Sequence, residues 1–384
     1  GFDFCGALPL IFQRFNGRDM TCKLGINISE TFRYSILKDL TASVTAGYNT
    51  STAIRDKQSK AIDWYNYAGD RVVRSNPTED KSSYSKSNSR TDFYSLSGHI
   101  DWSHIFADVH DVKVMVGSQY NLKEYEGTFL YTEGILPSLE IPNSTKDVVY
   151  LKNGDDKSTK WQEAVMSYFG RINYDYKGKY LFEANFRADA SSRFAPGNRW
   201  GYFPSFSGAW RISEESFMEN LRDSWLSSLK IRGSWGQLGN QDALGDGTPT
   251  GGDYYPWMNT YNLGANYPFG GSLVTGYYQG SYKMASLSWE KATTWGIGID
   301  FTLFNKLTGS IDYYNRKTTD IIMNVSVPKE FALGAYKDNV GAMKNSGIEV
   351  QLAYNDTWND WTFGVSGNFA YNKNTIENLG GVDR

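Results

Sequence analysis

The sequence predicts an all-β protein, an antiparallel transmembrane β-barrel wall of about twelve strands. Three observations lead to this prediction. Apolar and polar residues alternate with a period of two over long stretches, aromatic residues gather at the ends of these stretches, and short connections alternate with long ones. Alternation of this period indicates strands with two different faces. A membrane-spanning strand needs about 9–11 residues, whereas globular strands usually have about 5–6.

The first hairpin shows the alternation plainly. Apolar residues occupy mostly even positions from Cys22 to Tyr34, and the same parity resumes from Leu40 to Tyr48 after a short turn near 35–39. Comparable pairs of stretches follow along the chain. The other ten predicted strands lie at about 94–102, 112–122, 166–176, 180–189, 200–213, 227–237, 287–303, 307–323, 346–355 and 361–373.

Aromatic residues mark the ends of many predicted strands. Tyr and Trp favour the boundary between membrane and water, where one end of the ring system is wet and the other is apolar. The chain contains 27 Tyr, 21 Phe and 12 Trp although its mean hydropathy is only −0.50. The aromatic residues at strand ends are Tyr34, Tyr48, Trp102, Tyr174, Tyr176, Tyr180, Trp289, Tyr354, Trp361 and Tyr371.

The connections alternate in length. Short ones are expected near 35–39, 105–110, 177–178, 304–306 and 356–360, and long ones at about 51–90, 127–160, 238–286 and 324–345, with a smaller one at 191–199. Short periplasmic turns and long extracellular loops are typical of outer-membrane barrels. The link at 214–226 departs from this scheme, and Ser213 is expected to cap a brief helix there.

Composition excludes several other classes of protein. The longest apolar run, Ala7–Phe12, is far shorter than the roughly 20 residues of a membrane-spanning helix. A net charge of −3 lacks the basic surface that nucleic-acid binding requires. No HExxH, GxSxG, Walker loop or CxxC motif occurs, and the Gly-Ile-Gly at 296–298 lies within a predicted strand. We therefore expect neither enzymatic activity nor a cofactor.

No metal site is expected either. His99 and His104 lie in one predicted hairpin but are five residues apart, so their side chains should point to opposite faces of the sheet. The acidic stretch 153–156 and the pair Asp242 and Asp246 lack the ligand spacing of a calcium-binding loop. Solvated turns are the favoured interpretation of these acidic residues.

Aromatic clusters in two long loops are candidate substrate contacts. Aromatic rings can stack on the apolar faces of sugars, and loops on a rigid scaffold often carry function. The alternative is that these rings pack the loops together or against a partner. The candidates are Trp64, Tyr65, Tyr67, Tyr254, Tyr255 and Trp257.

Several sequence motifs resemble those of the SusC/RagA family of TonB-dependent outer-membrane transporters from Bacteroidota. They include SYFGRINYDYKGKYLF at 167–182 and ADASSRFAPGNRWGYFPSF at 188–206. Residues 1–160 fit the family only by their strand pattern. The motifs that carry the resemblance lie at Ser167–Phe182, Phe186–Phe206, Ala209–Glu215, Leu229–Gln241, Trp289–Trp295, Asn339–Val350 and Phe369–Ile376.

The resemblance implies a barrel of about 22 strands that is closed by an N-terminal plug. It also implies an outer-membrane location, contact with lipid, energy supplied through TonB, ExbB and ExbD, and a SusD-like lipoprotein over the extracellular mouth. On this basis residues 1–384 are expected to be a partial barrel domain, without the plug domain or the C-terminal strands.

Polar residues on the inward-facing side of two strands are the second set of candidates. In a membrane barrel the apolar face contacts lipid and the polar face lines the lumen. The alternative is that charged residues on neighbouring strands stabilise the wall or hold a plug. The lumen candidates are Arg171, Asn173, Asp175, Glu183, Asn185, Arg187 and Asp189.

The predicted function is import of a nutrient, an oligosaccharide or alternatively a peptide, across the outer membrane. A secreted or surface glycan-binding β-protein without transport activity is the main alternative. An outer-membrane enzyme is a third interpretation, which the missing catalytic motifs disfavour.

Overall fold

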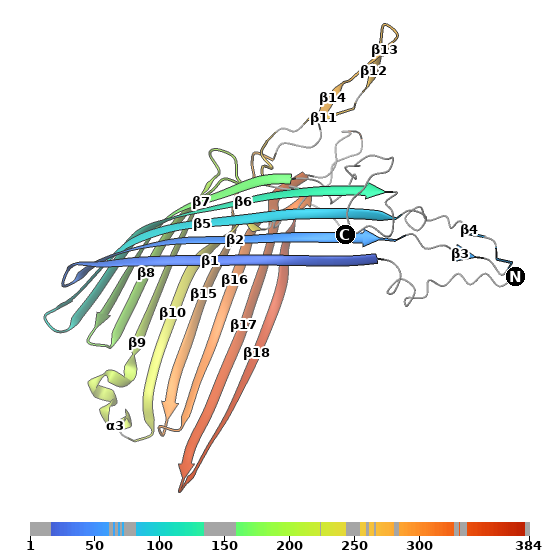
Figure 1. Ribbon diagram of the computed structural model, residues 1–384. Coiled ribbons are helices and arrows are strands. Elements are labelled where there is room, and N and C mark those ends of the chain that lie inside the picture. Colours follow the sequence, from blue (N-terminus) through green and yellow to red (C-terminus); the bar gives the residue numbers. More distant parts are fainter. Residues whose placement is uncertain are drawn as a thin grey trace.

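The computed structural model shows one large curved sheet with loops at its ends (Figure 1). It describes residues 17–60, 64–65, 68–69, 71–72, 82–133, 159–222, 224–242, 254–258, 261–264, 266–279, 284–325, 330 and 336–380. The long strands are β1 (Gly17–Leu37), β2 (Leu40–Ser59), β5 (Ser83–Phe106), β6 (His110–Glu133), β7 (Thr159–Tyr176), β8 (Tyr180–Ser191), β9 (Trp200–Arg211), β10 (Leu226–Asn240), β15 (Glu290–Leu303), β16 (Leu307–Val325), β17 (Tyr336–Trp358) and β18 (Trp361–Leu379).

The topology is a simple meander. The sheet has 12 strands in the order β1-β2-β5-β6-β7-β8-β9-β10-β15-β16-β17-β18, so each long strand lies beside the next long strand along the chain. All neighbours are antiparallel, and the hairpin registers are continuous apart from a few bulges. The predicted twelve antiparallel strands are therefore confirmed.

Several strands extend further toward the long-loop side than their alternation predicts. β5 begins at Ser83 and β6 continues to Glu133, where the sequence predicts a loop from about 51 to 90 and another from about 127. Apart from Tyr84, residues 83–92 are polar on both faces of the strand. The period-two signal is lost there, while the backbone hydrogen bonds between the strands continue.

The outward face carries two rows of aromatic residues. Trp200 and Trp210 lie ten positions apart on β9, which at about 3.3 Å per residue and a tilt of about 35–45° corresponds to a height of about 25 Å. This is the height of the apolar band of an outer-membrane barrel. Trp200 stacks beside Tyr168 with 6.0 Å between ring centroids, and Trp210 beside Tyr180 with 6.3 Å. We call these the upper and lower aromatic rows.

Tight turns join the strands at the lower end. In the turns after β5 and β15, Ala107 and Asp108 have φ of 48° and 58°, and Phe304 and Asn305 have φ of 56° and 54°. Two successive residues with positive φ are typical of type I′ turns, whose twist matches that of paired strands. These hairpins therefore need few linking residues.

One lower link is longer. Between β9 and β10 the chain forms η1 (Ile212–Glu214), η2 (Ser216–Met218) and α3 (Glu219–Arg222). The expected brief helix is present, but Ser213 does not cap it, because Ser213 is buried inside η1 and Arg211 precedes that turn. None of the helices in the described segments is long and apolar enough to cross a membrane.

Small sheets lie within the long upper loops. They are formed by β3 (Trp64–Tyr65) with β4 (Arg71–Val72), by β11 (Tyr261–Leu263) with β14 (Tyr277–Gln279), and by β12 (Tyr267–Phe269) with β13 (Ser272–Val274). The latter two pairs form a projecting arm in Figure 1.

A small apolar core fixes the upper ends of the central strands. Phe194 and Leu287 are fully buried, and they pack with Phe203, Trp289 and Ile322. Beside this core, the Asn339 side chain donates to the backbone oxygens of Ser288 (3.0 Å) and Asp320 (2.6 Å). These bonds attach the segment that leads into β15 to β17, and join β17 to β16.

We expect a charge on the outward face to destabilise the barrel far more than one on the inward face. Ile172 lies midway between Tyr168 and Tyr176 on the outward face, so Ile172→Arg should lower the unfolding free energy by about 2–4 kcal/mol. Ser207→Arg, on the opposite face near Glu183, is the control and should cost less than about 1 kcal/mol. Urea unfolding of the full-length protein in phospholipid vesicles measures both, and equal costs would contradict the assignment of faces.

Candidate functional site

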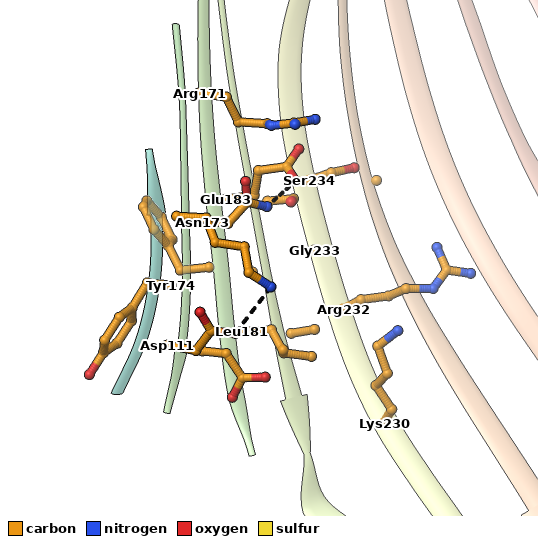
Figure 2. Close-up of a pocket in the computed structure, with 17 residues that line it drawn as sticks. Asp111, Arg171, Asn173, Tyr174, Leu181, Glu183, Lys230, Arg232, Gly233 and Ser234 are labelled. Carbon is orange, nitrogen blue, oxygen red and sulfur yellow. Dashed lines mark hydrogen bonds and ion pairs between the residues drawn. The ribbon is translucent and has the colours of Figure 1, made fainter. Parts of the chain in front are cut away.

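The candidate site is a recess of about 660 Å³ on the face opposite the aromatic rows (Figure 2). Residues of six neighbouring strands, β6 to β10 and β15, line it, so this face of the sheet is concave. Figure 2 shows Arg171, Glu183 and Arg232 reaching into the recess from different strands. The charged residues of its lining are Asp111, Lys113, Arg171, Asp175, Glu183, Lys230 and Arg232.

Alternation along β7 and β8 brings the predicted lumen candidates together. Arg171, Asn173, Asp175 and Glu183 line the recess directly. The other three candidates follow Glu183 on the same side of β8, further toward the long loops; they are Asn185, Arg187 and Asp189. The structure thus places all seven on one face, and their role in contacting a transported solute remains a prediction.

Glu183 is the centre of an amide–carboxylate group. Its two carboxylate oxygens accept hydrogen bonds from Asn173 (2.6 Å) and Asn185 (2.7 Å). Further up the same face, Arg187 donates to Asp189 at 2.8 Å and to the Ser167 hydroxyl at 2.8 Å. These contacts join β7 to β8 and hold the polar side chains in fixed positions.

Arg232 links three strands on the other side of the recess. Its guanidinium on β10 donates to Asp300 on β15 (3.1 Å) and to Asp312 on β16 (2.7 Å), and Lys230 lies 3.4 Å from Asp300. Because the group contains two cations and two carboxylates, its charges are balanced. Planar guanidinium groups suit such double contacts with carboxylates.

Arg171 differs from the other recess cations. Lys113 pairs with Asp111 at 3.1 Å, and Lys230 and Arg232 are paired as described. Within the part of the chain that the structure describes, Arg171 has no hydrogen-bond or ion-pair partner, and its side chain is exposed in the recess. It is therefore the recess cation best placed to meet an additional group.

Three stacked aromatic rings and one arginine pack together at the upper part of the concave face. Trp161 lies between Tyr125 and Tyr254, with centroid distances of 5.2 Å and 3.9 Å. The guanidinium of Arg193 lies 5.1 Å from the centroid of Tyr254. Arg193 and Tyr254 are both almost completely buried. Stacked rings at these distances attach the loop segment 254–258 to β6 and β7.

The ring candidates of the largest loop therefore have different surroundings. Tyr254 is covered on both faces, which supports the packing interpretation for this residue. The Tyr255 hydroxyl bonds to the backbone of Gln162, donating at 3.0 Å and accepting at 3.2 Å, while its ring stays 39% exposed. The Trp257 indole donates to the Ser192 carbonyl at 3.4 Å. Tyr255 keeps the ring face that could meet a ligand.

The candidates of the first long loop are described only in part. Trp64 and Tyr65 form strand β3, which pairs with β4, and their side chains lie outside the described atoms. Tyr67 lies outside the described residues altogether. Substrate contact by these three residues remains a prediction.

The histidines make no metal site in the described segments. His99 lies 3.2 Å from Asp101, whereas His104 lies 2.7 Å from Asp39, stacks beside Trp102 and meets Phe106 edge to face. No group of three or more His, Cys, Asp or Glu residues suited to a metal occurs among the described residues. The acidic stretch 153–156 and Asp246 lie outside them.

The sequence alone does not identify the Arg232 group or the Arg193 stack. Lys230 and Arg232 share the polar side of a predicted strand, and Asp300 and Asp312 lie on either side of the short turn at 304–306. Aligning the two strands around that turn would have placed the carboxylates close together. Nothing in the sequence around Arg193 signals that this residue would be buried.

Comparison with known proteins decides the family. The sequence profile described as "TonB dependent receptor-like, beta-barrel" matches residues 16–383, which is nearly the whole chain. The chain belongs to the TonB-dependent receptor family.

Two curated relatives narrow this assignment. The chain is 32% identical over 98% of its length to TonB-dependent receptor SusC of Bacteroides thetaiotaomicron, and 30% identical over 94% to TonB-dependent receptor P39 of Formosa agariphila. These matches cover 35% and 33% of the relatives. The chain thus spans about a third of the length of these TonB-dependent receptors, and the predicted likeness to the SusC/RagA group is confirmed.

Solved structures show the same fold. The RagAB peptide importer in its open-open state superposes with a TM-score of 0.79 at 22% identity, over 97% of this chain and 38% of that chain. The ferric-catecholate import receptor Fiu from E. coli K12 gives a TM-score of 0.53 at 11% identity, over 94% of this chain and 48% of that chain. The sheet is therefore part of the wall of a TonB-dependent barrel.

Family membership also gives the location. SusC/RagA-type receptors are outer-membrane β-barrels of Bacteroidota, and the chain is accordingly an outer-membrane protein. TonB-dependent receptors are transporters rather than enzymes. The outward aromatic rows face lipid, and the recess lies on the inner side of the receptor wall.

We expect Arg232→Met to destabilise the receptor, because it leaves Asp300 and Asp312 without their shared donor. The unfolding free energy should fall by about 1–2 kcal/mol, since the group is partly exposed. Arg171→Met is the matched control and should change stability by less than about 0.5 kcal/mol. Urea titration of the full-length receptor compares them, and an equal loss in both variants would contradict the assigned pairing.

Tyr254→Ala should release the loop segment 254–258 from the wall. Losing one stacked pair and the arginine contact should speed amide hydrogen exchange in this segment about tenfold, equivalent to about 1.4 kcal/mol. Tyr277→Ala, which removes a ring that is 71% exposed, should leave exchange at 254–258 unchanged. Unchanged exchange in Tyr254→Ala would show that other contacts hold the loop.

Proposed function

We propose that this chain forms one part of the wall of a nutrient importer that works with a SusD-like lipoprotein and is energised by TonB, ExbB and ExbD. The chain spans about a third of its curated relatives. In this proposal a plug domain, through which TonB acts, and the strands that complete a barrel of about 22 belong to the rest of the polypeptide. The lipoprotein covers the extracellular mouth.

The observation that carries the proposal is the polar recess on the inner side of the wall. Its Asn173 and Glu183 side chains, with Asn185 next to Glu183 on the same face, offer amide donors and carboxylate acceptors beside the guanidinium of Arg171. A solute with many hydroxyl or amide groups can exchange its hydrogen bonds with water for bonds to such groups. An apolar solute would gain nothing there.

An oligosaccharide is the favoured substrate class. Its hydroxyl groups match the mixed donors and acceptors of the recess, and the exposed ring of Tyr255 suits stacking on a sugar face. A peptide is the second candidate, because the recess presents charges of both signs, and the structurally similar RagAB complex is named a peptide importer. The alternative of a secreted glycan-binding protein loses its support, because the family is one of outer-membrane receptors.

We predict that deleting the gene will abolish growth on one class of glycan or peptide as sole nutrient. The control is the same strain complemented with the wild-type gene, which should grow normally on every nutrient of the panel. The measurement is growth on defined glycans and peptides, together with detergent extraction of the tagged receptor to test for a co-purifying lipoprotein. Normal growth of the deletion strain on every nutrient tested would contradict nutrient import.

A further inference from the structure

The link between β9 and β10 exposes large apolar side chains at the lower end of the wall. Phe217 is 65% exposed, Leu221 38% and Trp225 43%. They lie in η2, in α3 and just before β10, at intervals of four residues along the link. Met218, by contrast, is buried. The link therefore exposes three large apolar side chains, and we call Phe217, Leu221 and Trp225 the apolar triplet.

The start of this link is attached to the lower aromatic row. The Glu215 carboxylate accepts hydrogen bonds from the indole of Trp210 (3.1 Å) and the ammonium of Lys179 (3.1 Å). Trp210 points outward from β9 and stacks beside Tyr180. Together with the Tyr180 hydroxyl, these donors lower the pKa of Glu215, so the carboxylate stays ionised and keeps all three contacts.

The end of the link is fixed at the same level. The backbone N–H of Phe304, in the turn between β15 and β16, donates to the Trp225 carbonyl at 2.8 Å. Phe304 is itself 61% exposed. The apolar triplet thus continues a band of exposed rings that runs from Tyr180 and Trp210 to the next turn of the wall.

One charged pair lies within the link, where Arg222 is 3.4 Å from Glu214. Two other lower connections that bear exposed rings are tight turns. This longer link exposes apolar rings together with charged side chains, a mixture that suits a membrane interface.

Energetics favour a lipid environment for the triplet. Moving a large apolar side chain from water to an apolar environment gains free energy in proportion to the area removed from water. Trp also prefers the headgroup level, where its ring is in apolar surroundings and its N–H remains hydrated. The link that bears the triplet is bonded through Glu215 to Trp210 of the outward-facing lower aromatic row, so lipid is the apolar medium that adjoins it.

We propose that the link Ile212–Trp225 is a membrane-interface anchor, with Phe217, Leu221 and Trp225 inserted at the headgroup–acyl boundary of the periplasmic leaflet. The anchor fixes the height and tilt of the central strands relative to the bilayer. Glu215 is its positioning residue, because it connects the link to Trp210 and Lys179. This proposal concerns the lipid contact of the wall and does not depend on which nutrient is transported.

Spin labels test the proposal in the full-length receptor, in phosphatidylethanolamine–phosphatidylglycerol vesicles and in a background with cysteines replaced by serine. Labels at Phe217→Cys and Leu221→Cys should collide with oxygen, which concentrates in lipid, several-fold more often relative to a water-soluble nickel chelate than a label at Glu219→Cys. Phe206→Cys on the lipid-facing wall is the reference for full lipid contact. Two label positions keep the test informative if one variant folds poorly.

Two outcomes would overturn the anchor. A high nickel collision rate at both apolar positions would place the triplet in water. Shielding of both positions from oxygen and from nickel would show that a protein surface covers the triplet instead of lipid.

A second measurement uses Glu215→Gln, which should raise the nickel accessibility of the label at position 217. A purely local role of Glu215 would leave that accessibility unchanged.

Discussion

The constraint on which the whole structure depends is that no backbone N–H or C=O can remain without a hydrogen bond inside lipid. A meander of long antiparallel strands serves this demand between its edges, since each strand bonds to its chain neighbour, over the whole of both strands in the β5–β6 hairpin. Other features follow from it. Every second side chain of a strand faces lipid, and the links are confined to the two ends of the strands. Aromatic rings such as Trp200 and Trp210 mark the edges of the apolar band.

The same constraint determines where polar chemistry can occur. Because alternate residues of each strand face lipid, the residues between them form a continuous inner surface. Side chains of adjacent strands on that surface lie close enough to form hydrogen bonds and ion pairs. Glu183 on β8 therefore accepts hydrogen bonds from amides on β8 and on the adjacent β7. Arg232 on β10 reaches carboxylates on β15 and β16. Lateral pairing joins the strands of the wall, and among the recess cations it leaves Arg171 without a hydrogen-bond or ion-pair partner in the described chain.

Sequence reasoning succeeded where the signal is local and failed where it depends on register or tertiary packing. The period of two identified the strands and placed Arg171, Asn173 and Glu183 on one face. It could not show that Arg232 bridges three strands, because that contact depends on how two hairpins align. The burial of Tyr254 could not be predicted either, because the residues that cover its ring, Trp161 and Arg193, are distant in the sequence. The largely polar upper part of β5 lost its alternation and so escaped detection.

The meander has an evolutionary consequence. β10 and β15 are direct neighbours in the sheet although two small two-stranded sheets intervene between them in the chain. Closing a longer loop costs only slightly more entropy than closing a shorter one, so the wall is nearly indifferent to what is inserted between its strands. Extracellular loops can therefore lengthen, shorten or be exchanged under selection for new cargo while the hairpins beneath them stay unchanged. The scaffold and the specificity of such a receptor can diverge at separate rates.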